Sequence, residues 1–346
     1  MPRLLVLVNP SVDRLYGDLR STLLHAETDV VLRTEAGWEA TVEAPVDIGG
    51  ATFVPIESRT APNESMLATL GELSFAAGLF EAVDDGALRG VPGGLRRGRW
   101  PTSLLTIQRY RGKTNETFTR LLVNVARGLF VRAGSEARRR VLDPLAGRGT
   151  TLNAVMYADM DAAGIELNGA GVDQYVAFIS RWLKDHRVKH RLDRSSVRGA
   201  RGERCTRVDV YYGTSKAEVA SRRSGALTIV NGDTSNVATW FGTKAFDALV
   251  TDLPYGVQHG STAGDRLSRS AVGLVSDAAA AWRAALRPGA PAVLAFNQLT
   301  TDRDELLAAL VEAGFEVVDL AASLEHQVDA SIRRDVVVVR RPGPAR

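Results

Sequence analysis

The alternation of apolar runs with helical patterns after residue 140 restricts the fold of this chain more than any other feature. Seven short apolar runs are predicted strands: 141–143, 163–167, 227–230, 247–252, 291–296, 315–320 and 335–339. Helical patterns fill most of the gaps between them, at 150–160, 170–186, 272–286 and 302–313. Alternating helices and nearly continuous apolar strands are typical of a parallel sheet covered on both faces. The pattern predicts an α/β, Rossmann-like doubly wound fold, whose ligands bind beyond the carboxyl ends of the strands.

The chain has 346 residues, a length that suggests about two domains. Residues 1–85 mix short apolar runs with helical patterns and predict a small N-terminal α+β domain. Residues 86–140 predict a basic, glycine-rich linker followed by a helix from about 115 to 130. Residues 141–346 form the predicted α/β domain, with a basic insert at 187–226 that is longer than the fold needs.

Basic charge is concentrated in two stretches of an otherwise acidic chain. Residues 1–85 carry 5 Lys/Arg and 14 Asp/Glu, residues 86–140 carry 13 and 2, and residues 181–226 carry 13 and 5. Blocks of one sign favour a polyanionic partner, because each neutralised phosphate releases counterions. Nucleic acid is the favoured partner, and solvated arginine-rich loops are the alternative.

Several classes of protein are disfavoured by composition. A single cysteine, Cys205, excludes an intramolecular disulfide and a cysteine-based zinc site, and no metal is expected. The first apolar run, 4–8, is too short for a signal peptide core or a membrane span. We therefore expect a cytoplasmic protein with no membrane partner.

A glycine-rich loop follows the first predicted strand, in the sequence DPLAGRGTT at 143–151. Gly147 and Gly149 allow the backbone to approach a ligand, and the next helix directs its first amides toward it. A dinucleotide fingerprint would place a third glycine at position 152, where this chain has leucine. The loop therefore favours a smaller nucleoside ligand.

Acidic residues follow the next two strands. Glu166 stands 19 residues after Gly147, where a carboxylate suits the two hydroxyls of a ribose. Asp233 is placed to accept a hydrogen bond from an adenine amine. A surface or capping role is the alternative for Glu166, and a helix N-cap is the alternative for Asp233 that can coexist with binding.

The fourth strand ends in TDLPYG at 251–256, the most informative stretch of the sequence. An amine conjugated to an aromatic ring is a poor nucleophile. The Asp252 carboxylate and the Leu253 carbonyl could each accept one of its N–H groups, while Pro254 stiffens the turn. Tyr255 could stack on a base. The alternative is a local turn with a core tyrosine.

The segments DPLAGRGTT, GIELN, NGDT and TDLPYG, in this order, resemble motifs of class I S-adenosylmethionine-dependent methyltransferases that methylate amines. The resemblance covers about residues 105–341 and is greatest to the tRNA guanine-N2 methyltransferases that accompany THUMP-like domains. It implies a seven-stranded sheet with an antiparallel last strand, and S-adenosylmethionine as cofactor. The cofactor residues that it implies are Asp143, Pro144, Ala146, Gly147, Gly149, Thr150, Glu166, Asp233 and Thr234.

The segment RYRGKTNE at 109–116 resembles the motif that precedes the sheet in this family. The resemblance places Thr114 and Asn115 at the cofactor, and Arg109, Arg111 and Lys113 at substrate phosphate. An N-capped helix behind a basic loop is the alternative. His259 is a further candidate for the substrate pocket.

Two features depart from the family pattern. Leu253 replaces the usual first proline, and residues 1–85 show no THUMP signature. The insert at 187–226 carries Tyr211 and Tyr212 among basic residues, so it is either a clamp for single-stranded RNA or a disordered loop.

The sequence thus predicts an enzyme, an S-adenosylmethionine-dependent N-methyltransferase acting on an exocyclic nucleobase amine. Guanine N2 in tRNA or another RNA is favoured, with Asp252, Leu253, Pro254 and Tyr255 at the reacting amine. The alternatives are methylation of adenine N6 in DNA, methylation of a small molecule, and a catalytically silent RNA-binding protein. A partner subunit and a homo-oligomer both remain open.

Overall fold

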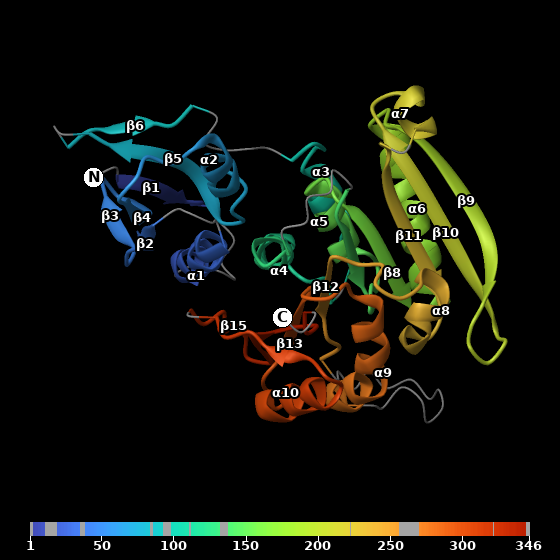
Figure 1. Ribbon diagram of the computed structural model, residues 1–346. Coiled ribbons are helices and arrows are strands. Elements are labelled where there is room, and N and C mark those ends of the chain that lie inside the picture. The colour runs from blue at the N-terminus through green and yellow to red at the C-terminus, as the bar shows by residue number, and fades with distance from the viewer. Residues whose placement is uncertain are drawn as a thin grey trace.

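The computed structural model describes residues 3–10, 19–34, 39–83, 86–92, 98–110, 112–131, 138–221, 223–255, 270–320 and 322–343. Two β-sheets organise this part of the chain (Figure 1). The smaller sheet belongs to the N-terminal region, and the larger one to the region after residue 138.

The larger sheet has ten strands in the described residues, in the order β14-β16-β13-β12-β7-β8-β11-β10-β9, with β15 paired to β16. Strands β7, β8, β11, β12 and β13 are parallel, whereas β16 runs antiparallel to β13. Their bounds are β7 (Arg140–Asp143), β8 (Asp161–Glu166), β9 (Lys189–Arg198), β10 (Arg204–Gly213), β11 (Gly225–Asn231), β12 (Ala248–Asp252), β13 (Pro291–Asn297), β14 (Glu316–Val317), β15 (His326–Asp329) and β16 (Ile332–Arg340).

Helices cover both faces of this sheet. One hydrophobic core joins α4 (Glu116–Gly128), α5 (Thr150–Tyr157) and α6 (Gly169–Asp185) to one face. A second core joins α8 (Val237–Phe241), α9 (Ala271–Ala285) and α10 (Arg303–Glu312) to the other. The Rossmann-like doubly wound fold predicted from the sequence is confirmed.

The strand count corrects the prediction of seven. The seven predicted strands are present as β7, β8, β11, β12, β13, β14 and β16, although β14 is only two residues long. Strand β15 is added, and the insert contributes β9 and β10. These two pair in continuous register from Lys189↔Gly213 to Arg198↔Arg204, so the predicted alternative of a disordered loop is wrong for this part of the insert. Strand β9 has only two apolar residues, Leu192 and Val197, so no alternation of polar and apolar residues marked it as a strand within the basic stretch.

The N-terminal region holds a six-stranded antiparallel sheet of β1 (Arg3–Val8), β2 (Ala40–Val42), β3 (Val46–Ile48), β4 (Ala51–Ser58), β5 (Ala76–Ala82) and β6 (Leu88–Gly90). Its helices are α1 (Leu19–Thr34) and α2 (Glu64–Leu70). Strand β6 lies within the stretch predicted as linker and pairs with β5.

Helix α4 connects the two sheets (Figure 1). It follows the short α3 (Ser103–Thr106) and packs on α1 as well as on β12 and β13. Glu27 of α1 is fully buried, and its carboxylate accepts hydrogen bonds from Ser74 and from Asn124 of α4. Burial raises the pKa of Glu27, and these hydrogen bonds oppose that rise. The N-terminal region thus contacts α4 through a buried network of hydrogen bonds.

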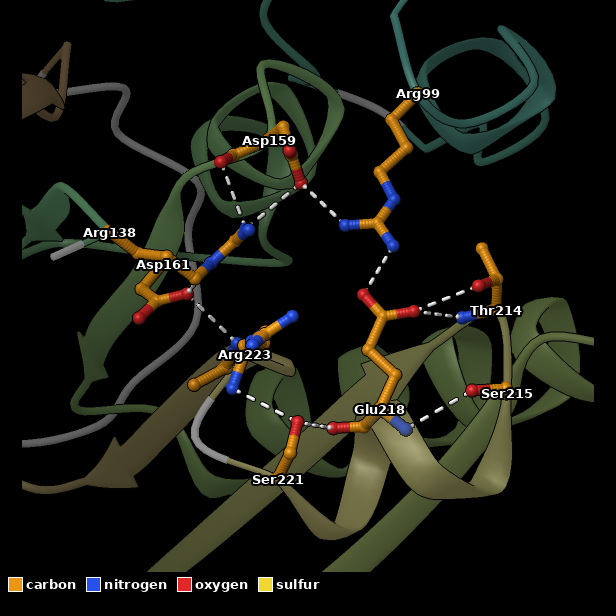
Figure 2. Close-up of polar contacts among 10 residues, drawn as sticks. Arg99, Arg138, Asp159, Asp161, Thr214, Ser215, Glu218, Ser221 and Arg223 are labelled. Atoms are coloured by element: carbon orange, nitrogen blue, oxygen red, sulfur yellow. Dashed lines mark hydrogen bonds and ion pairs between the residues drawn. The ribbon is translucent and has the colours of Figure 1, made fainter. Parts of the chain in front are cut away.

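Ion pairs attach the predicted linker to the edge of the larger sheet at which β7 and β8 begin (Figure 2). The Arg99 guanidinium contacts Asp159 at 3.2 Å and also Glu218 of α7 (Lys216–Ala220), and Arg138 bonds to both Asp159 and Asp161. Basic residues that look free in the sequence are therefore neutralised here by acids from distant segments. No helix in the described part of the chain has the length and hydropathy needed to span a bilayer.

Candidate active site

Four acidic residues lie along the carboxyl edge of the larger sheet. Asp143 ends β7, Glu166 ends β8 and Asp252 ends β12, and these three strands are neighbours through β7. Asp233 follows β11 and is exposed. The sheet therefore brings together, at the edge where doubly wound folds bind ligands, the acids that the sequence singled out.

The glycine-rich loop closes against β8. The Gly147 amide donates to Glu166 Oε2 at 2.8 Å, and the Ala146 amide donates to the Ile165 carbonyl at 2.8 Å. Gly147 has a φ of +51°, and a Cβ there would meet no atom within 4 Å. The loop therefore presents bare backbone to open space beside the Glu166 carboxylate.

Gly149 serves packing rather than access. It is the N-cap of α5 and has a φ of +80°, and a Cβ added there would lie 2.2 Å from the ring of Tyr175. Tyr175 is itself fully buried and donates to Asn153 at 3.1 Å. Glycine is therefore required at position 149 by packing against Tyr175, whereas at position 147 it leaves open space beside the backbone.

Asp143 is a buried carboxyl that accepts hydrogen bonds from Thr251 Oγ1 at 2.8 Å and from the Leu145 amide at 3.1 Å. Burial raises the pKa of Asp143 from 3.8 to about 6, and the neighbouring Asp252 charge adds to that rise. The geometry fits a residue that orders the loop from beneath.

Replacing Asp143 with asparagine should change the pH dependence of stability. When folding raises the pKa of an acid, the protein loses stability as the pH rises. For Asp143 this loss runs from the pKa of the unfolded state, near 4, to the pKa of the folded state, near 6. Asparagine does not titrate and retains an oxygen for both donors. The variant should therefore gain about 3 kcal/mol in unfolding free energy relative to the parent between pH 4 and pH 7. Urea unfolding across this range measures the difference, and a constant difference would contradict the assignment.

Asp252 is held from three directions. Its Oδ2 accepts a hydrogen bond from Thr114, and its Oδ1 accepts one from the Tyr255 hydroxyl at 2.6 Å. Arg334 of β16 donates to the Tyr255 hydroxyl, and its guanidinium lies 3.9 Å from Asp252 Oδ2. The Asp252 side chain is nevertheless 17% exposed, so a ligand can reach one side of the carboxylate.

Burial and the neighbouring side chains shift the pKa of Asp252 in opposite directions. Burial raises the pKa of Asp252, whereas the positive charge of Arg334 and the hydrogen bonds from Thr114 and Tyr255 lower it. Burial and the Asp252 charge raise the pKa of Tyr255, so its hydroxyl remains a donor at neutral pH. The result is a partly accessible carboxylate beside an oriented aromatic ring.

Several residues predicted to bind ligands have partners within the chain. Asn115 caps α4 by accepting from the amides of Thr117 and Phe118, which is the alternative the sequence left open. Lys113 donates to the Leu105 carbonyl and pairs with Glu116. Thr114 contacts Asp252. Their proposed ligand roles would require these contacts to be shared.

The remaining predicted residues are more varied in their surroundings. Asp233 caps the 3₁₀ turn η1 (Thr234–Asn236), and Thr234 accepts a hydrogen bond from the buried Trp282. Arg109 is exposed. Leu253 is buried and Pro254 is exposed. Arg111 and His259 lie outside the described residues.

Sequence reasoning missed three residues at this edge. The Tyr110 hydroxyl lies 2.7 Å from Thr150 Oγ1, with the Arg148 guanidinium over its ring. Arg334 donates to the Tyr255 hydroxyl from a position 79 residues later along the chain. Leu167, after Glu166, is 64% exposed. Of the three, only Leu167 could have been found from the sequence, because it is an apolar residue directly after the acidic Glu166, which ends β8.

Comparisons with known proteins give no family for this chain, because no family model and no curated protein matches it. Among solved structures, TrmN from Thermus thermophilus aligns at 14% identity and a TM-score of 0.42, over 99% of this chain and 100% of that one. A putative RNA methyltransferase from Pyrococcus horikoshii aligns at 14% and 0.38, over 73% and 93%. A TehB-like SAM-dependent methyltransferase from Corynebacterium glutamicum aligns at 14% and 0.36, over 64% and 86%. Values this low carry no inference about substrate or cofactor.

Proposed function

We propose that this protein is an S-adenosylmethionine-dependent N-methyltransferase that acts on an exocyclic nucleobase amine, with guanine N2 in tRNA or another RNA as the first candidate. The observation that carries the proposal is the Asp252 group. A partly exposed carboxylate lies at the carboxyl edge of the sheet, beside a tyrosine ring and one strand away from the glycine-rich loop.

The residues beside the glycine-rich loop fit the proposed cofactor. The open space over Gly147 admits a ligand against bare backbone, which a Cβ would narrow. Glu166 would hold the ribose hydroxyls, Leu167 offers apolar surface to a base, and the exposed Asp233 would accept from the adenine amine. The cofactor would supply a methyl group already activated by its sulfonium.

The acceptor side of the site is built to orient an amine. A carboxylate offers about four lone-pair directions, and Thr114 and Tyr255 use two of those on Asp252. The remaining directions can accept an N–H of the substrate and align its nitrogen. Arg334 favours the ionised carboxylate, which can then take the proton that the amine releases.

Tyr255 has a second role in this proposal. Its hydroxyl is fixed between Arg334 and Asp252, so its ring is held beside the carboxylate. A base stacked on that ring would place its amine at Asp252, and such stacking contributes roughly 1–3 kcal/mol.

The test uses purified protein, methyl-labelled S-adenosylmethionine, and separate pools of total RNA and genomic DNA from cells lacking the gene. Nucleosides are resolved by mass spectrometry. Label in N2-methylguanosine from small RNA is the expected result. Label in N6-methyladenine from DNA would replace RNA with DNA as substrate, and no label in either pool would refute the proposal for nucleic acids.

Substitution of Arg334 should change the rate of methyl transfer without changing the affinity for the cofactor. Arg334→Gln removes the charge that lowers the pKa of Asp252 and weakens the hold on Tyr255. We expect kcat to fall about tenfold or more, with little change in cofactor affinity. The acid limb of the pH–rate profile should move to higher pH, because Asp252 would ionise later.

Two further variants control this experiment. Arg334→Lys keeps the charge and should restore the pH profile in part. Arg333→Gln changes the adjacent residue, which is half-exposed and pairs with Glu325, and should leave the profile unchanged. A profile for Arg334→Gln that overlays the parent's would show that Arg334 does not act on Asp252.

A further inference from the structure

Many basic residues of the stretch 86–140 pair with acids in the fold and are not available to a partner. Within 86–140, these basic residues each pair with a carboxylate: Arg89, Arg99, Lys113, Arg127, Arg138 and Arg139. These ion pairs neutralise most of the basic side chains that the structure describes in this stretch. An RNA partner would instead contact basic side chains that are exposed and that pair with no carboxylate in the described residues.

The turn between β9 and β10 provides such side chains. We define the hairpin tip as residues 198–204. Arg198, Arg201 and Arg204 are exposed, and none of them pairs with a carboxylate in the described part of the chain. The one acid of the hairpin tip, Glu203, already accepts hydrogen bonds from the Arg201 amide and from Asn236.

Hydrogen bonds hold the hairpin tip in a defined turn and connect it to α8. The Gly199 and Gly202 amides donate within the turn, to Glu203 and Gly199, and Gly202 has a φ of +83°. Trp240 of α8 donates through its indole to the Arg198 carbonyl at 2.9 Å. Arginines on a fixed turn lose less conformational freedom on binding than arginines on a mobile loop.

The position of the hairpin tip connects it to the candidate site. Thr206 of β10 pairs with Asn231, the last residue of β11, so the hairpin tip extends beyond the carboxyl edge of the sheet. The Ala200 amide donates to Asn236 Oδ1 at 2.7 Å, within the turn that Asp233 caps. The lower end of the hairpin lies beside α8 (Figure 1).

Of the two tyrosines that the sequence suggested as an aromatic clamp in this insert, one is buried. Tyr212 is only 1% exposed and packs edge-on against Trp100, and its hydroxyl donates to the Met160 carbonyl. Tyr211 lies under the Arg191 guanidinium. Tyr212 is therefore not available to stack on a base, and Tyr211 is half-buried with Arg191 over its ring, so the exposed arginines are the more accessible feature of the hairpin.

We propose that the hairpin tip binds the phosphate backbone of the RNA substrate through Arg198, Arg201 and Arg204, and so directs the target base toward the Asp252 edge. The inference rests on the proposed function, because it takes RNA as the substrate. Guanidinium groups bind phosphate oxygens in fork geometry, and three of them on one turn place a concentrated positive charge beside the strand.

The test measures binding rather than methyl transfer. The affinity of a fluorescein-labelled single-stranded RNA oligonucleotide is determined by anisotropy at about 50–200 mM KCl. In the variant Arg198→Gln/Arg201→Gln/Arg204→Gln, we expect about tenfold weaker binding. The slope of log K against log salt should be less steep by about 2, since each lost single-strand phosphate contact removes about 0.7.

A triple variant elsewhere removes the same charge. Arg59→Gln/Arg89→Gln/Arg181→Gln changes three exposed arginines that already pair with acids, and it should bind RNA as the parent does. Equal losses in the two triple variants, or an unchanged slope in the hairpin-tip variant, would overturn the proposal. If the parent binds and methylates RNA but the hairpin-tip variant does so equally well, only the hairpin-tip proposal fails. If the parent binds no RNA, the proposed function fails with it.

Discussion

Asp252→Ala should reduce methyl transfer by about a thousandfold or more while cofactor affinity stays within about tenfold of the parent's. The substitution removes the acceptor that orients the amine and receives its proton. It also leaves the hydroxyls of Thr114 and Tyr255 without this acceptor, and it removes the carboxylate that lies 3.9 Å from the Arg334 guanidinium. Gly147 and Glu166 bond to each other and, in the described part of the chain, not to Asp252, so the cofactor side should remain intact. Single-turnover rates and calorimetric titration with S-adenosylmethionine measure the two quantities.

Two companion variants make this result interpretable. Asp252→Asn keeps the size of the side chain but offers one acceptor oxygen instead of two, so its rate should lie between those of the parent and Asp252→Ala. Asp185→Ala removes an exposed acid at the end of α6 and should behave like the parent. Near-normal turnover in Asp252→Ala would exclude Asp252 as the acceptor. Loss of cofactor binding together with turnover would indicate that the variant has lost its fold.

The parallel core of the larger sheet could be predicted from the sequence because each of its strands, β7, β8, β11, β12 and β13, carries its own apolar run. The acids at the carboxyl edge were predictable for the same reason, since parallel strands place their ends together. Asp143, Glu166 and Asp252 needed only the order of the strands to be brought to one edge. Local pattern therefore accounts for the part of the site that each strand end supplies.

Contacts made between distant segments could not be predicted in this way. Nothing near Arg334 in the sequence indicates that it contacts Tyr255, and nothing near Thr114 indicates that it contacts Asp252. The same limit explains the charge blocks. Arg99 looks free in its own segment, but Asp159 and Glu218 neutralise it in the fold (Figure 2). Side-chain pairing over such separations is fixed by the register of the sheet and by helix packing.

The two loop glycines should separate stability from cofactor binding. Gly149→Ala should cost about 3 kcal/mol in unfolding free energy. A left-handed φ of +80° costs an alanine about 1–2 kcal/mol. Overpacking adds about 1–3 kcal/mol. The added Cβ would lie 2.2 Å from Tyr175, whose hydroxyl is tied to Asn153 and whose ring is fully buried. Because the ring cannot move away freely, the helix start must shift. Urea unfolding of the variant measures this cost.

Gly147→Ala is the matched control and should show the opposite balance. Its φ of +51° costs about 1 kcal/mol, but the new Cβ would meet no protein atom within 4 Å. That methyl group would instead occupy the open space beside Glu166, where we propose the cofactor lies. Affinity for S-adenosylmethionine should therefore fall about tenfold or more in Gly147→Ala, with only a small loss of stability. Equal stability losses in the two variants would show that Tyr175 yields to the Cβ at position 149. Unchanged affinity in Gly147→Ala would show that the cofactor does not approach this loop, because a ligand against bare backbone cannot ignore a methyl group placed on it.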